Sequence, residues 1–285
     1  MLVLKTVREA QEALGPLKNK NTLALVPTMG CLHQGHLALA HRAREVADKV
    51  VVSIFVNPLQ FGPHEDFAQY PRTFEADKKM LEEIGVDYLF HPEASDLYPP
   101  GFASTLRTGA IAEILCGRFR PGHFDGVATV CMKLFQITHA DFAVFGEKDY
   151  QQLQVIRQTV RDLNVPVTLL PHATVREADG LALSSRNRYL SPVERKLASQ
   201  VPEALRAIQT QARKKPETSV RTLLELGHQA LQSLEVQYLE ITSGPGLKPA
   251  APQMPLSALR EPRTFLAVKI GKTRLIDNMS LEVPV

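Results

Sequence analysis

Short apolar runs alternate with helical patterns through the first half of the chain. The runs are rich in β-branched residues, and the segments between them repeat apolar residues at intervals of three and four. Nearly continuous apolar strands are typical of a parallel sheet whose two faces are covered by helices. Strands are predicted at residues 22–26, 50–56, 86–90, 142–145 and 167–170, and helices at 37–47, 74–84, 126–137 and from the turn 146–149 to about 163. This order predicts an α/β fold with a Rossmann-like, doubly wound parallel sheet.

The pattern changes at about Thr174. Ser191 and Glu194 form a capping box that predicts the start of a long helix, and residues 217–234 predict another. Strand-like runs follow at 236–242, 265–270 and 273–276, with a Pro-rich connection at 244–262. We therefore expect two domains, a Rossmann-like domain at residues 1–174 and a smaller α+β domain at residues 175–285.

Composition narrows the class of protein. The 33 basic and 30 acidic residues are scattered, and a net charge of +3 without a basic stripe argues against nucleic acid as a partner. The three cysteines have neither disulfide nor Cys-x-x-Cys spacing, which suits a reducing compartment. The N-terminus turns polar early, and the longest apolar stretch, 50–56, is far shorter than a bilayer span. A cytoplasmic protein without a membrane segment is expected.

Three polar turns follow predicted strands, at residues 27–36, 57–62 and 146–149. Ligands of open α/β sheets bind beyond the carboxyl ends of the strands, so these turns are expected to converge. In the first turn, Gly30 and Gly35 would let the backbone approach a phosphate while the N–H groups of the next helix face it. His33 and His36, three residues apart, would address one phosphate group together.

The histidine pair has other interpretations. A His-x-x-His spacing is also compatible with two surface histidines or with zinc, but zinc needs a further ligand, and His41 and His64 have no recognisable zinc spacing. A His-x-Gly-His sequence after a strand, with Gly30 at the preceding turn, resembles the signature of the nucleotidyltransferase superfamily, which includes class I aminoacyl-tRNA synthetases. Nucleotide binding is therefore expected at residues 27–36, the signature loop.

Several longer motifs indicate more closely which family the chain resembles. They lie at residues 26–36, 55–62, 70–73, 120–124, 145–153 and 183–187. Together they resemble the pantothenate synthetase (pantoate–β-alanine ligase) family along the whole chain, densely up to Asn187 and thinly afterwards. The resemblance implies that ATP and pantoate give pantoyl-adenylate and pyrophosphate, and that β-alanine then gives pantothenate and AMP. It further implies nucleotide and pantoate binding by the first domain, closure of the second over the active site, magnesium with ATP, and a homodimer.

Ionised pantoate needs no base, so its activation requires alignment and dispersal of charge at the α-phosphate. The resemblance implies that His33 and His36 supply donors there. Lys148 would contact the ATP phosphates, while Ser184 and Arg186 would cover the triphosphate and stabilise departing pyrophosphate. The complete implied ATP-binding set is Pro27, Thr28, Met29, Gly30, His33, His36, Gly146, Glu147, Lys148, Asp149, Val175, Leu183, Ser184, Ser185 and Arg186.

The acid substrate carries a carboxylate and two hydroxyls, which side-chain amides can bind as donors and acceptors. The resemblance implies Gln60 and Gln152 for this task. Asn57 and Met29 complete the expected pantoate and β-alanine set.

Four further residues have less specific expectations. The resemblance places the magnesium carboxylate at Asp77, although a solvated helix face explains that residue equally well. Arg120 and His123 would lie near the active site or at a dimer contact. Cys31, beside the nucleotide at a helix N-terminus, would have an acidic thiol open to alkylation.

Three other functions share part of these features. The signature loop alone would suit a nucleotidylyltransferase that leaves AMP on its product. The set of Gln60, Gln152 and Ser184-Ser185-Arg186 argues against this alternative. A tRNA synthetase is disfavoured by the length and by the scattered charge. A nucleotide-sensing module would hold ATP with the same loops and perform no chemistry.

Overall fold

The computed structural model describes residues 1–63 and 65–282, so that His64 lies outside the described part. The chain divides into two compact units. The first contains Met1–Glu147 and Val155–Ala173, and the second contains Lys148–Gln154 and the residues from Thr174 onward. The short segment Lys148–Gln154 thus belongs to the second unit, which no local pattern had indicated. The roles expected for the two domains stay predictions.

The first unit contains one parallel sheet, as the sequence predicted, in the strand order β1-β4-β3-β2-β5-β6. From β2 the chain adds β3 and β4 on one side and then β5 and β6 on the other, so the strand order reverses between β2 and β5. Such a reversal is where doubly wound sheets form their ligand crevice. The strands are β1 (Leu2–Leu4), β2 (Leu23–Thr28), β3 (Lys49–Ile54), β4 (Tyr88–Phe90), β5 (Phe142–Gly146) and β6 (Thr168–His172).

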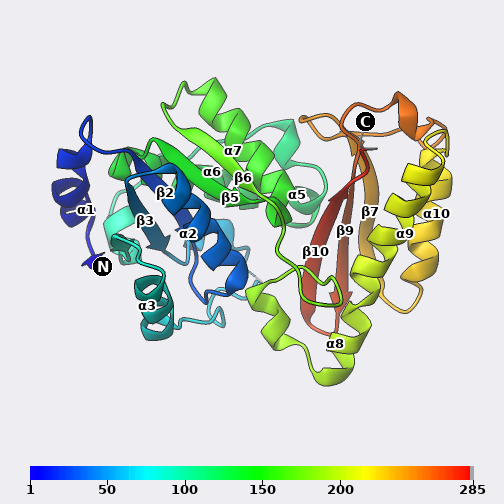
Figure 1. The fold of residues 1–285 in the computed structure, drawn as a ribbon, viewed down its shortest axis with the longest axis horizontal. Coiled ribbons are helices and arrows are strands. Elements are labelled where there is room, and N and C mark those ends of the chain that lie inside the picture. The colour runs from blue at the N-terminus through cyan, green and yellow to red at the C-terminus, as the bar shows by residue number, and fades with distance from the viewer. Residues whose placement is uncertain (64, 283–285) are drawn as a thin grey trace. The chain divides into compact units, whose positions relative to one another are not determined.

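Helices cover both faces of this sheet (Figure 1). Helices α2 (Gln34–Val46) and α3 (Phe74–Glu83) pack on one face, where their apolar residues join those of β2, β3 and β4 in a buried cluster. Helix α6 (His123–Thr138) contacts β2 without joining that cluster and so lies on the other face, beside α1 (Val7–Leu14). Helix α7 (Tyr150–Asp162) leads from β5 to β6. The cluster includes Val26, Leu37, Ala40, Val52, Leu81, Leu89 and Val144.

The second unit is α+β, as expected. Its antiparallel sheet has the order β10-β9-β7-β8, and helices α9 (Gln200–Lys214) and α10 (Val220–Ala230) pack against it (Figure 1). The strands are β7 (Glu235–Ser243), β8 (Lys248–Pro249), β9 (Arg263–Ile270) and β10 (Thr273–Ser280). The buried interface is formed by Val201, Leu205, Ile208, Leu223, Leu239, Leu266 and Val268.

The long helix predicted after Ser191 is wrong in its length. The capping box is present, but it opens the short helix α8 (Pro192–Ala198), and α9 begins only at Gln200. Pro202 lacks the N–H group that would continue the helical hydrogen bonding from α8. Ser199 stands at the break, with its hydroxyl donating to the carbonyl oxygen of Lys196 at 2.9 Å.

Two elements at the N-terminus, β1 and α1, had no sequence prediction, because three residues of strand and two turns of helix carry little periodic signal. Further single turns occur at α4 (Ala94–Leu97) and α5 (Cys116–Phe119). Within the described residues, no helix is both long enough and apolar enough to cross a membrane.

Candidate active site

The signature loop leaves the carboxyl end of β2 beside β3 and β5. Thr28 fixes its beginning, because its hydroxyl donates to the carbonyl oxygen of Ser53 at 2.7 Å and accepts from the Gly30 N–H at 3.2 Å. His33 fixes its end as the N-cap of α2, with Nδ1 accepting from the Gly35 N–H at 3.1 Å. The loop is therefore pinned to the sheet at one end and to a helix at the other.

The two histidines of the loop lie together. The ring centroids of His33 and His36 are 4.1 Å apart, with the planes tilted by 36°. Because Nδ1 of His33 accepts a hydrogen bond, the neutral imidazole carries its proton on Nε2. His33 thus presents a ring donor in its neutral form, one helical turn from His36.

The backbone amides of the loop correct one expectation. The N–H groups of Cys31 and Leu32 both donate to the Asp77 carboxylate, and those of Gly35 and His36 donate to His33. These four amides are therefore satisfied inside the protein and do not face a phosphate as the sequence had suggested.

Cys31 also differs from its expectation. Its side chain is fully buried, and its backbone adopts a left-handed conformation with φ of 50°. A buried thiol is shielded from alkylating agents, so the predicted accessible thiol is wrong. Asp77 likewise does not belong to a solvated helix face, since it is only 1% exposed.

A second group of polar residues follows β3. The Asn57 side-chain amide donates to Oε1 of Gln60 at 3.0 Å and to the carbonyl oxygen of Gly126 at 3.1 Å, while Nε2 of Gln60 contacts Sδ of Met29 at 3.0 Å. The hydroxyl of Tyr98 donates to Oδ1 of Asn57 at 2.8 Å. Met29, Asn57 and Gln60, here called the Gln60 cluster, thus connect the turn after β3 to the signature loop, to which Met29 belongs.

Arg120 and His123 support the Gln60 cluster through the carbonyl oxygen of Gln60. Nδ1 of His123 lies 2.8 Å from the carbonyl oxygen of Gln60, and Nε2 lies 3.0 Å from an Arg120 guanidinium nitrogen. Since guanidinium only donates, His123 carries its proton on Nδ1 and donates it to Gln60. Arg120 also forms a two-point ion pair with Glu65. Burial acts to raise the pKa of Glu65, but the hydrogen bond and charge of Arg120 outweigh it and hold that pKa below its usual value.

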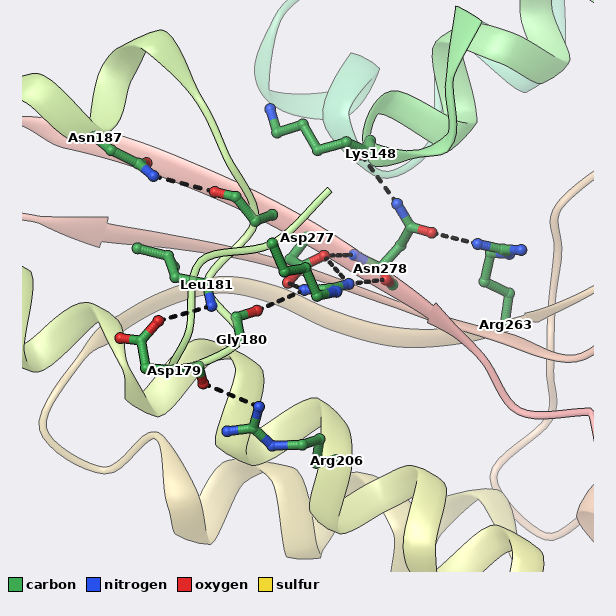
Figure 2. A network of polar contacts seen from close by, with 11 residues as sticks. Lys148, Asp179, Gly180, Leu181, Asn187, Arg206, Arg263, Asp277 and Asn278 are labelled. Carbon is green, nitrogen blue, oxygen red and sulfur yellow. Dashed lines mark hydrogen bonds and ion pairs between the residues drawn. The ribbon is translucent and has the colours of Figure 1, made fainter. Parts of the chain in front are cut away.

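The β5 turn begins in the first unit with Gly146 and Glu147 and continues in the second with Lys148 and Asp149. The carbonyl oxygen of Lys148 accepts from Nδ2 of Asn278 at 3.0 Å. Figure 2 shows the Lys148 side chain extending away from this contact. Its ammonium group lies 3.5 Å from the Asp149 carboxylate. Strand β10 therefore holds the backbone of Lys148, while the side chain pairs with Asp149.

The motif at residues 183–187, here called the Ser184 motif, follows a tight hairpin in the second unit. The Leu183 N–H donates to the Val175 carbonyl at 3.0 Å, and Arg176 at the base of the hairpin forms an ion pair with buried Asp277. Ser184 then caps a short 3-10 helix (Ser185–Tyr189) by accepting from the Arg186 N–H at 3.3 Å. Figure 2 shows Asp277 and Asn278 at the centre of a network of polar contacts in the second unit.

In the first unit, the structure brings the rings of His33 and His36 together and places Gln60 in contact with Asn57 and Met29. Asp149 and Gln152 accompany Lys148 in the second unit. No local pattern had indicated five further polar residues of these networks, because their partners are distant in the chain: Tyr98, Glu65, Arg176, Asp277 and Asn278. For Asp277 and Asn278, polar residues at buried positions of β10 were the available signal. Among the residues that the structure describes, no group of three or more His, Cys, Asp or Glu side chains is arranged to hold a metal ion.

Known proteins resemble the chain over its whole length. A pantothenate synthetase of Azotobacter vinelandii is 49% identical, with 99% of this chain and 100% of the relative covered. One of Geobacillus kaustophilus is 46% identical, with 100% of this chain and 94% of the relative covered.

Solved structures agree with this similarity. The pantothenate synthetase of Thermus thermophilus superimposes with a TM-score of 0.93 at 44% identity over all of both chains. A Francisella tularensis pantoate-β-alanine ligase complexed with β,γ-ATP and β-alanine gives a TM-score of 0.82 at 34% identity, covering 100% of this chain and 99% of that one. The family model described as pantoate-β-alanine ligase matches residues 2–280. The chain therefore belongs to the pantoate–β-alanine ligase family.

Proposed function

We propose that this protein condenses pantoate with β-alanine at the expense of ATP, through a pantoyl-adenylate. The observation that carries the proposal is the pair of imidazoles, 4.1 Å apart, at the carboxyl end of β2 next to the Gln60 cluster. A nucleotide phosphate and a small hydroxy acid can meet there. The family membership and the Francisella relative's complex with β,γ-ATP and β-alanine support the same substrates.

In the first step, a pantoate carboxylate oxygen attacks the α-phosphorus of ATP and pyrophosphate leaves with the bonding electron pair. The carboxylate is already ionised, so no proton has to be removed. Nε2–H of His33 and the ring of His36 would stabilise the charge that develops on the α-phosphate oxygens. Lys148, Ser184 and Arg186 would bind the phosphates that depart.

In the second step, the neutral amine of β-alanine attacks the acyl carbon and AMP leaves. The amine nitrogen loses one proton to solvent as the amide forms, and the attacking carboxylate oxygen of pantoate remains on AMP. Gln60 and Gln152 would hold the pantoate carboxylate and hydroxyls through both steps. Asn57 and Met29 would line the same site.

The remaining ATP-binding set is proposed by family resemblance. Asp149 would accept from the ribose hydroxyls, and Gly146 would allow close approach of the nucleotide. The others are Pro27, Thr28, Met29, Gly30, Glu147, Val175, Leu183 and Ser185.

Three further properties belong to the proposal. When bound with ATP, magnesium would neutralise phosphate charge. A homodimer through the first domain is proposed by family resemblance. A cytoplasmic location is supported by three cysteines without a disulfide pattern.

Product analysis tests the proposal. With ATP, magnesium, pantoate and β-alanine together, we expect AMP and pantothenate in equal amounts, with no AMP release above background when β-alanine is omitted. A stable adenylylated product would instead identify a nucleotidylyltransferase. A nucleotide-sensing module predicts binding without turnover; we expect His36→Ala and Lys148→Ala each to slow adenylate formation by about 10²-fold or more, and unchanged kcat in both would refute the assigned roles.

A further inference from the structure

Asp77 is a buried carboxylate on the first turn of α3. Its Oδ2 accepts from the Cys31 N–H and its Oδ1 from the Leu32 N–H, both at 2.8 Å. The Thr73 hydroxyl adds a third donor to Oδ1, at 3.1 Å. All three donors belong to the protein, and two of them belong to the signature loop.

The loop backbone explains why a carboxylate is needed. Gly30 and Cys31 are consecutive residues in the left-handed region, with φ of 79° and 50°. The N–H groups of Cys31 and Leu32, which follow this turn, both point at the one carboxylate of Asp77, and converging backbone N–H groups favour an anion. Without Asp77, the buried amides of Cys31 and Leu32 would have no acceptor, which is unfavourable for the loop. A Cβ on Gly30 would approach a side-chain oxygen of Asp77 to 3.1 Å and a methyl group of Ile54 to 2.9 Å, so the fit is close.

We propose that Asp77 is the positioning residue of the signature loop, fixing the two residues that precede His33 so that the imidazoles of His33 and His36 meet the α-phosphate. The inference rests on the proposed function for the identity of that phosphate. Leu32 is held by Asp77, and the next residue, His33, is held by its own cap on α2. Leu32 and His33, which connect Asp77 to the imidazole, are therefore both fixed by hydrogen bonds.

The same geometry does not fit a magnesium ligand. Magnesium requires nearly octahedral coordination and keeps most of its waters, so a ligating carboxylate must be open to solvent on its metal side. The Asp77 carboxylate has accepted three hydrogen bonds and is 1% exposed. Its negative charge is used to hold the loop.

The test compares Asp77→Asn with Asp87→Asn. Asparagine preserves size but turns one acceptor into a donor that faces a loop N–H. Asp87 is the matched control, because its carboxylate accepts from the Val50 N–H at 2.9 Å at the opposite, amino end of β3. Adenylate formation is measured by pyrophosphate release, the magnesium concentration for half-maximal rate is measured for each variant, and amide hydrogen exchange reports on Cys31 and Leu32.

For Asp77→Asn we expect kcat to fall roughly 10- to 100-fold, with a smaller change in the KM for ATP and an unchanged magnesium dependence. Exchange at the two loop amides should rise at least about tenfold, and α10 should be unaffected. Asp87→Asn should lower the melting temperature and leave kcat within about twofold of the unmodified protein. Should Asp77→Asn fail to fold, Thr73→Val, which removes only the hydroxyl donor, is expected to change kcat and exchange in the same direction.

Two outcomes would overturn the proposal. One is an Asp77→Asn variant whose loop exchange and kcat both match the unmodified protein. The other is a loss of rate that added magnesium restores, which would make Asp77 a metal ligand. If the unmodified protein forms no adenylate, the proposed function fails, whereas the exchange comparison still decides whether Asp77 anchors the loop.

Discussion

The side-chain amide of Asn57 donates to Oε1 of Gln60 at 3.0 Å in a buried environment. This bond orients Gln60, so that Nε2 lies against Met29 in the signature loop. Asn57→Asp replaces the donor with an oxygen that faces the acceptors of Gln60 and Gly126. We expect a loss of at least about 2 kcal/mol in the free energy of unfolding and a fall of about tenfold or more in kcat/KM for pantoate.

Chemical denaturation and initial-rate kinetics measure both effects. The KM for ATP should change much less than that for pantoate, because Asn57 acts on Gln60. Equal losses for the two substrates would contradict a specific role of Asn57 in the acid site.

Gly126 lets helix α6 approach the turn that carries Gln60. A Cβ at Gly126 would lie 2.2 Å from the carbonyl oxygen of Leu59 and 2.7 Å from the backbone nitrogen of Gln60. Gly126→Ala must therefore displace backbone, and we expect about 1–3 kcal/mol of destabilisation together with a raised KM for pantoate.

Gly15→Ala is the control for this substitution. Gly15 has ordinary helical φ of −52° and open space around its Cβ position, so alanine there should be neutral or stabilising by up to about 1 kcal/mol. A Gly126→Ala protein with native stability and native KM would show that the close contact relaxes without moving Gln60.

His33 combines two tasks that substitution can separate. Its Nδ1 caps α2, and its Nε2–H is the proposed phosphate donor. Asparagine is a good N-cap but cannot reach as far, so His33→Asn should preserve stability within about 0.5 kcal/mol and slow adenylate formation about 10²-fold. His33→Ala should lose the same rate and in addition about 1 kcal/mol of stability.

Melting curves and single-turnover rates distinguish the two variants. A His33→Asn protein that forms adenylate at the unmodified rate would show that His33 is not a phosphate donor. Equal instability in both variants would show that the imidazole stabilises the loop beyond its capping role.

The Glu65–Arg120 ion pair predicts an acid limb in the curve of stability against pH, that is, a decline in the free energy of unfolding as the pH falls. Because the pKa of Glu65 is lower in the folded protein than in the unfolded chain, the pair stabilises the fold above the unfolded value, about 4.3, and this contribution is lost as pH falls through the folded pKa. Glu65→Gln should cost about 1 kcal/mol at neutral pH and make the decline below about pH 5 shallower.

Glu12→Gln is the matched control, since Arg8 and Glu12 form a pair whose side chains are 86% and 63% exposed. Glu12→Gln should leave the dependence of stability on pH unchanged. A Glu65→Gln protein with the same acid limb as the unmodified chain would mean that other carboxyl groups dominate the loss.

Much of the first unit was predictable because buried parallel strands are continuously apolar and the helices between them have a clear period. The break at Ser199 was not, since the capping box at Ser191 marks where a helix starts and says little about its length. The partners of Asp77 and Lys148 were hidden for another reason. Asp77 lies 46 residues from Cys31, and Asn278 lies 130 residues from Lys148, so only the folded chain brings them together.

If pantoate is activated as an acyl-adenylate, one oxygen of its carboxylate is transferred to AMP. Pantoate labelled with heavy oxygen at both oxygens of the carboxylate is converted with ATP and β-alanine, and the products are examined by mass spectrometry. We expect one labelled oxygen in each AMP molecule formed, carried by its phosphate group. Unlabelled AMP, or label in inorganic phosphate released with ADP, would contradict activation as an acyl-adenylate.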